Sequence, residues 1–111
     1  MIAMALAAAL SQAGAPTAPA SYEAALRCAG LTQAASELEG GESREGRRLY
    51  DAALYWSLTL VQTAPAAGRG PEAVDRDQTR ARIRAVRELA AEDPAALAEL
   101  RGCRDRTPSL G

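Results

Sequence analysis

The sequence contains no lysine, histidine, phenylalanine or asparagine among its 111 residues. Without histidine, it lacks the side chain that most often acts as a general base or metal ligand near neutral pH. The absence of lysine excludes Schiff-base chemistry and the usual lysine contact of a P-loop. It also contains no glycine-rich phosphate loop, nucleophile elbow or spaced set of metal ligands. We therefore expect no enzymatic activity, no cofactor and no metal.

Positive and negative charges are nearly balanced. All thirteen basic residues are arginine and fourteen residues are acidic, so the formal net charge is -1. Aromatic residues make up 4% of the chain and do not alternate with basic ones. Nucleic-acid-binding domains combine a basic excess with clustered positive charge, so nucleic acid is not expected as a partner.

Large apolar side chains are also few. Apolar residues account for 48% of the chain, but 27 residues are alanine. A chain of this length forms one small domain, and its alanine-rich interior supplies little hydrophobic stabilisation per residue. Such a domain commonly needs a covalent link.

The first twenty residues resemble a secretory leader. Residues 2–10 form an uncharged apolar run, which fits a signal-peptide core and is too short to span a bilayer. Small residues favour cleavage after Ala13 or Ala20. The alternative is a simple Ala/Pro-rich tail, because no basic residue precedes the apolar run. We predict a periplasmic or secreted protein whose mature chain has no transmembrane segment.

The two cysteines support the same prediction. Cys28 lies near the start of the remaining chain and Cys103 near its end. An even number of cysteines in a short exported chain predicts a disulfide. Closing a loop of this length contributes about 4 to 5 kcal/mol in the chain-entropy model. A catalytic thiol is disfavoured because no histidine is present to activate it. A zinc site is disfavoured because it needs about four ligands and two distant cysteines are too few.

The fold class predicted is all-α: a small four-helix domain with three longer helices and a short C-terminal one, linked by the disulfide. Helix-breaking glycine and proline residues separate segments rich in Ala, Leu, Arg and Glu, which are strong helix formers. Residues 21–106 form the single domain and residues 107–111 a flexible tail. The predicted helices are 21–39, 43–64, 71–92 and 94–104.

Side chains suited to helix starts support these boundaries. Ser21 can cap the first helix, Pro71 suits the first turn of the third, and Asp93 followed by Pro94 forms a cap and first-turn pair for the fourth.

Helical periodicity predicts the core. The second helix is the most apolar, since Tyr50, Leu54, Leu58 and Val61 crowd the side opposite its core stripe. A helix that is apolar on most sides is normally central, so we expect this one to lie in the middle of the domain. The predicted core residues are Leu31, Leu49, Trp56, Leu60, Val86 and Leu100.

The apolar arcs of the neighbouring helices follow the same period. We place Leu38 on the buried stripe of the first helix and Ile83 on that of the third.

The third helix carries a row of arginines at helical spacing, namely Arg76, Arg80, Arg84 and Arg87. The segment is neutral overall, so the row is either an ordinary solvated face or an anion-binding surface. Arg82 instead falls among apolar positions. We expect it to meet a carboxylate of another helix, from Glu37, Glu39 or Asp51.

These observations predict a small exported protein that acts by contact with an unknown protein partner in the cell envelope. The contact would use Tyr55 and the narrow polar slice around it, or apolar side chains left uncovered by an incomplete core. One alternative is a binder of anionic envelope components through the arginine row together with Arg101, Arg104 and Arg106. Another is an acid-stress chaperone that opens through its carboxylates, because no histidine can act as the switch. The oligomeric state is left open.

Overall fold

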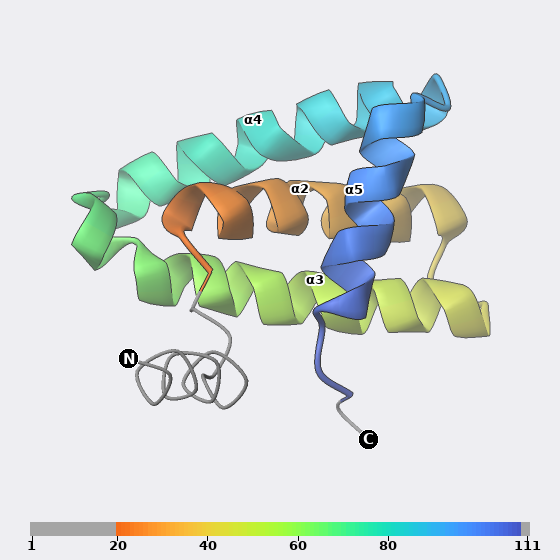
Figure 1. Ribbon diagram of the computed structural model, residues 1–111, viewed down its shortest axis with the longest axis horizontal. Coiled ribbons are helices and arrows are strands. Elements are labelled where there is room, and N and C mark those ends of the chain that lie inside the picture. The colour runs from red at the N-terminus through yellow and green to blue at the C-terminus, as the bar shows by residue number, and fades with distance from the viewer. Residues whose placement is uncertain (1–19, 110–111) are drawn as a thin grey trace, which may run out of the picture.

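The computed structural model describes residues 20–109, and these fold into helices joined by short turns (Figure 1). No strand occurs among these residues, and the predicted four-helix, all-α class is confirmed. The predicted leader lies outside the described residues except for Ala20. The elements are α2 (Tyr22–Glu39), α3 (Arg44–Thr63), the 3-10 turn η1 (Pro65–Ala67), α4 (Pro71–Ala90) and α5 (Pro94–Asp105).

Side-chain caps fix where the helices begin. The Ser21 hydroxyl accepts from the Ala24 amide at 3.1 Å, and the Asp93 carboxylate accepts from the Ala96 amide at 3.2 Å. Each cap satisfies an amide that has no partner inside its helix. Pro71 occupies the first turn of α4, as predicted.

Two helices end slightly earlier than predicted. Helix α3 ends at Thr63 because Pro65 cannot donate a backbone hydrogen bond, and the chain tightens into η1. Helix α4 ends at Ala90, since Glu92 adopts a left-handed conformation with φ of 56°.

Helix α2, and not α3, is the central helix. It packs against α3, α4 and α5, whereas α3 and α4 touch little, and Figure 1 shows α2 between the other two with α5 crossing it. Ala25, Ala29, Thr32 and Ala34 are all buried on α2. The expectation of a central α3 is therefore wrong. Small side chains allow neighbouring helices to approach α2 closely on several sides. In this fold the small side chains, and not the number of large apolar ones, determine which helix is central.

One glycine allows a close approach between α2 and α4. A Cβ placed on Gly30 of α2 would lie 2.8 Å from the carbonyl oxygen of Ala81 on α4. Any larger side chain would push the two helices apart, so the absence of a side chain at this position allows α4 to pack on α2.

The hydrophobic core lies along the contact between α2 and α3. Leu31, Leu49, Trp56 and Leu60 are buried there. Val86 of α4 and Leu100 of α5 are only partly buried and pack against the edge of the same core.

Two side chains that the sequence pattern predicts to be buried lie at the surface instead. Leu38 is 53% exposed and Ile83 is 39% exposed. Leu38 lies at the last turn of α2, and Ile83 lies on the far side of α4, so neither is covered by a neighbouring helix.

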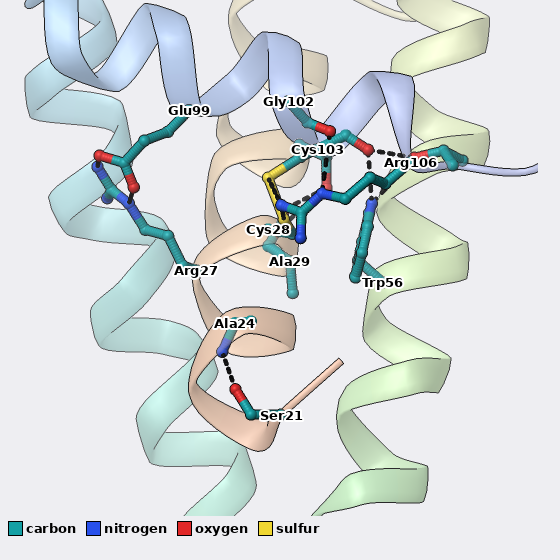
Figure 2. Close-up of a disulfide and its surroundings, with 12 residues drawn as sticks. Ser21, Ala24, Arg27, Cys28, Ala29, Trp56, Glu99, Gly102, Cys103 and Arg106 are labelled. Atoms are coloured by element: carbon teal, nitrogen blue, oxygen red, sulfur yellow. Dashed lines mark hydrogen bonds and ion pairs between the residues drawn. A yellow bond between two sulfur atoms is a disulfide. The ribbon is translucent and has the colours of Figure 1, made fainter. Parts of the chain in front are cut away.

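The predicted disulfide joins α2 to α5 (Figure 2). The Cα atoms of Cys28 and Cys103 lie 5.4 Å apart, and both residues are buried. Trp56 of α3 lies beside this link and donates from its indole Nε1 to the Thr107 hydroxyl at 2.9 Å. Thr107, the first residue of the predicted tail, in turn donates to the carbonyl of Cys103 at 2.8 Å.

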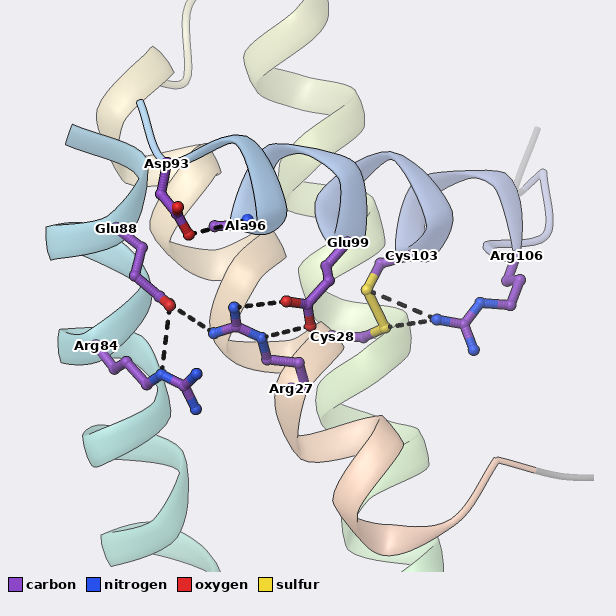
Figure 3. Close-up of polar contacts among 9 residues, drawn as sticks. All are labelled: Arg27, Cys28, Arg84, Glu88, Asp93, Ala96, Glu99, Cys103 and Arg106. Carbon is purple, nitrogen blue, oxygen red and sulfur yellow. Dashed lines mark hydrogen bonds and ion pairs between the residues drawn. A yellow bond between two sulfur atoms is a disulfide. The ribbon is translucent and has the colours of Figure 1, made fainter. Parts of the chain in front are cut away.

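Ion pairs also connect the helices. Arg27 of α2 bonds Glu88 of α4 at 2.7 Å and Glu99 of α5 at 2.9 Å, as Figure 3 shows. Arg82 of α4 bonds Glu37 of α2 at 3.1 Å, which confirms the predicted carboxylate partner.

Candidate functional site

The outward face of α3 carries four large apolar side chains in a single row. Tyr50 is 56% exposed, Leu54 46%, Leu58 63% and Val61 59%. Their spacing of four, four and three residues places them on one side of the helix. We call these four residues the α3 ridge.

The ridge exists because α3 is apolar on two opposite sides while only one of them has a neighbour. Leu49, Trp56 and Leu60 occupy the side that packs on α2. Within residues 20–109, no element covers the other side. Isolated exposed leucines are ordinary on protein surfaces, but a contiguous apolar row on one helix is typical of an interaction surface.

An apolar hollow of about 380 Å³ adjoins the C-terminal end of the ridge. It forms where the chain turns through η1 from α3 into α4. Arg69, Asp75 and Gln78 provide its polar rim. Its apolar lining consists of Val61, Ala64, Pro65, Pro71 and Val74. We call it the η1 hollow.

Tyr55 is not part of this exposed face. It is half-buried, packs against the core and makes an edge-to-face contact with Trp56, with ring centroids 5.1 Å apart. Tyr55 is therefore only partly exposed, whereas Arg48 and Asp51 on the same side of α3 are exposed. The interaction role expected of Tyr55 stays a prediction.

The four arginines of the α4 row are all exposed. Arg80, Arg84 and Arg87 border one shallow depression together with Ile83 and Glu88, and Arg76 lies outside it. Arg84 pairs with Glu88 at 3.4 Å.

The remaining members of the row differ from Arg84. Within residues 20–109, Arg76, Arg80 and Arg87 form no salt bridge.

Two of the three arginines near the C-terminal end of α5 have partners elsewhere. Arg104 forms an ion pair with Glu45 of α3. Arg106 lies over the Trp56 ring, 5.4 Å from its centroid, with its Nη2 3.3 Å from the Cys28 sulfur. Arg104 therefore lies against α3, and Arg106 lies against Trp56 and the disulfide. Arg101 is exposed on α5.

The carboxyl groups whose pKa is shifted are all stabilised as anions. The hydrogen bond from Tyr22 lowers the pKa of Asp77, and the Arg27 guanidinium lowers the pKa of both Glu88 and Glu99. A general acid would need the opposite shift of its pKa.

Across the described range, no cluster of three or more metal-binding side chains occurs. No helix in that range is long and apolar enough to cross a membrane.

The fold and these surfaces define a small, disulfide-linked, all-helical protein. No protein-family model matches the chain, and no curated protein or solved structure matches it at a significant level. The residues of the ridge are visible in the sequence pattern, but their exposure is not, because exposure depends on which helix takes the central position.

Proposed function

We propose that this chain is an exported protein that acts by binding a protein partner through the α3 ridge. The observation that carries the proposal is the exposure of Tyr50, Leu54, Leu58 and Val61 on one face of a helix whose opposite face is already packed. A helix that presents apolar residues at this spacing fits a partner helix or groove.

The energetics favour such contact. Covering a half-exposed leucine or tyrosine contributes on the order of 1 kcal/mol per side chain. Four adjacent side chains therefore supply a few kcal/mol, and the remainder of the affinity would come from the surrounding contacts.

The disulfide and the predicted leader support the proposed location. Disulfides persist in oxidising compartments, and the pairing of Cys28 with Cys103 is compatible with a place outside the cytoplasm. Combined with the apolar run at residues 2–10, it supports a periplasmic or secreted protein of the cell envelope.

Affinity capture from an envelope extract tests the proposal. The chain should capture a defined protein at both low and high salt, because apolar contacts are not screened. Leu58→Glu should remove the captured protein. Leu38→Glu is the matched control, since Leu38 is equally a surface leucine but lies on α2. Equal capture by both variants would show that the ridge is not the binding surface.

The arginine row supports a second candidate, the binding of anionic polymers such as acidic polysaccharide. Three arginines border one depression, and Arg76, Arg80 and Arg87 have no salt-bridge partner within residues 20–109. Binding of this kind should weaken steeply as salt rises. Titration of a sulfated polysaccharide at two salt concentrations, with Arg80→Gln plus Arg87→Gln as the variant, separates this candidate from the first.

A further inference from the structure

We infer that the occupant of the α3 ridge is a second copy of this chain, packed antiparallel across a two-fold axis. The inference rests on the proposed function, since it names the partner of the same surface. Three features of the described residues support it: the symmetry of the ridge, the fit between its two ends, and the charges beside them.

The ridge reads nearly the same in both directions. Leu54 and Leu58 form its centre, with Tyr50 four residues before and Val61 three residues after. When two copies run antiparallel about a point midway between the leucines, Leu54 of one copy meets Leu58 of the other. The same operation places Tyr50 opposite Val61. A two-fold interface requires such self-complementarity.

The two ends of the ridge are also complementary in shape. Tyr50 is a protruding aromatic side chain at one end, and the η1 hollow lies beside Val61 at the other. Tyr50 precedes Ser57 by two helical turns and so lies on the same side of α3. Ser57 accepts a hydrogen bond from Gln78 of α4 at 2.7 Å, so this is the side that faces α4 and the hollow.

The two-fold axis is perpendicular to both α3 helices. It therefore turns the α4-facing side of α3 in the same direction in both copies. Tyr50 of each copy therefore points toward the apolar lining of the other copy's η1 hollow. The contact forms twice in one dimer.

Charge selects the antiparallel arrangement over the parallel one. Arg47 lies one turn before Tyr50, and Asp75 stands on the rim of the η1 hollow. Neither forms an ion pair within residues 20–109. Antiparallel packing brings Arg47 of one copy toward Asp75 of the other, whereas parallel packing would place Arg47 against Arg47 and leave the hollow empty.

The nearby charges do not oppose this pairing. Arg69, at the same end as the hollow, is already bound to Asp77 at 2.9 Å. Asp51 lies on the opposite flank of α3, where it lines a separate hollow with Arg48 and Arg104.

The contact is modest in size. One face of a 20-residue helix is about 30 Å long, and a pair of such faces buries less than the roughly 1,600 Å² of a standard interface. We therefore expect a reversible dimer with a dissociation constant in the micromolar range.

Sedimentation equilibrium of the purified, disulfide-intact chain tests the inference over about 1 μM to 1 mM. We expect a monomer–dimer equilibrium that Leu58→Glu weakens by roughly 100-fold or more and Leu38→Glu leaves unchanged. Circular dichroism confirms that each variant remains folded. A monomer at every concentration, or a dimer insensitive to Leu58→Glu, would overturn the inference.

A charge exchange tests the orientation. Arg47→Glu and Asp75→Arg should each weaken the dimer by roughly tenfold, because the symmetric interface contains the pair twice. The double variant should recover the original affinity to within about twofold. Additive losses in the double variant would contradict the antiparallel contact.

Failure of self-association is distinguishable from failure of the proposed function. If the chain is monomeric but Leu58→Glu still abolishes capture of a different protein, the second-copy inference is overturned and the ridge retains its binding role.

Discussion

Trp56 is the residue at which the core, the disulfide and the C-terminal segment meet. Its ring is buried against α2, its indole donates to Thr107, and the Arg106 guanidinium lies over its face. A tryptophan combines a large apolar surface with one hydrogen-bond donor that needs a partner when buried. Both requirements are met here, so the sequence-based placement of Trp56 in the core agrees with its 2% exposure.

Gly30 provides a prediction at the same scale. Replacing a helical glycine by alanine ordinarily stabilises a helix by up to about 1 kcal/mol. In Gly30→Ala, however, the new Cβ would lie 2.8 Å from backbone atoms of Ala81, which cannot move without shifting α4. We expect a net destabilisation of about 1 to 3 kcal/mol, measured by urea unfolding.

Gly102→Ala is the control for this prediction. Gly102 is also helical, in α5, but a Cβ built there meets no atom within 4 Å. This variant should be neutral or stabilised by up to about 1 kcal/mol. If both alanine variants gain stability, the close approach of α2 and α4 is not as tight as described.

At the scale of the elements, the ion pairs of Arg27 connect α2 to both α4 and α5, as Figure 3 shows. The guanidinium lowers the pKa of Glu88 and Glu99 and is itself held charged, since its own pKa is raised by the bond to Glu99. The partly buried Arg27 guanidinium and the two carboxylates thus connect three helices.

Acid should weaken this connection. A carboxyl group whose pKa is lower in the folded chain contributes stability that is present above its unfolded pKa. That stability is lost as the pH falls from about 4.3, the ordinary value for Glu, through the lowered folded value. We expect the free energy of unfolding to fall over this acidic range, by a modest amount because Glu99 is half-exposed.

Glu88→Gln combined with Glu99→Gln provides the comparison. Removing both titrating groups should flatten the acidic part of the stability curve, measured by urea unfolding between pH 6 and about pH 3. If the free energy of unfolding still falls with the same slope in acid, other carboxyl groups are responsible for the acid response. This measurement also bears on the acid-stress alternative, because opening under acid requires such a loss of stability.

The sequence predicts the number of helices, the caps Ser21 and Asp93, and a carboxylate partner for Arg82 from three candidates. These features depend on local periodicity and on residue types with specific backbone roles. It does not predict that α2 is central. That outcome depends on the close packing allowed by Gly30 and the alanines around it, which becomes visible only when helices are placed together. The η1 hollow depends on the same tertiary arrangement, since η1 and α4 must meet beside Val61.

At the scale of the whole molecule, one covalent link holds an alanine-rich interior together. Helix α5 is short and packs mainly on α2, and the disulfide fixes it there. The link spans 75 positions and so constrains most of the described chain when it is unfolded. By contrast, the hydrophobic side chains of α3 are divided between the core and the exposed ridge, so only part of them stabilises the single chain.

Removing the disulfide should therefore lower stability by about 4 kcal/mol in the chain-entropy model. Cys28→Ala with Cys103→Ala is the appropriate variant, because serine would bury two hydroxyl groups beside Trp56. Guanidinium unfolding of the two proteins gives the difference, and reductant should leave the alanine variant unaffected. Equal stability would mean that packing and polar contacts, such as the Arg27–Glu99 and Arg104–Glu45 ion pairs, hold α5 without the disulfide. A loss of the expected size would mean that the disulfide supplies a large part of the stability of the fold, which is consistent with the proposed export of the chain.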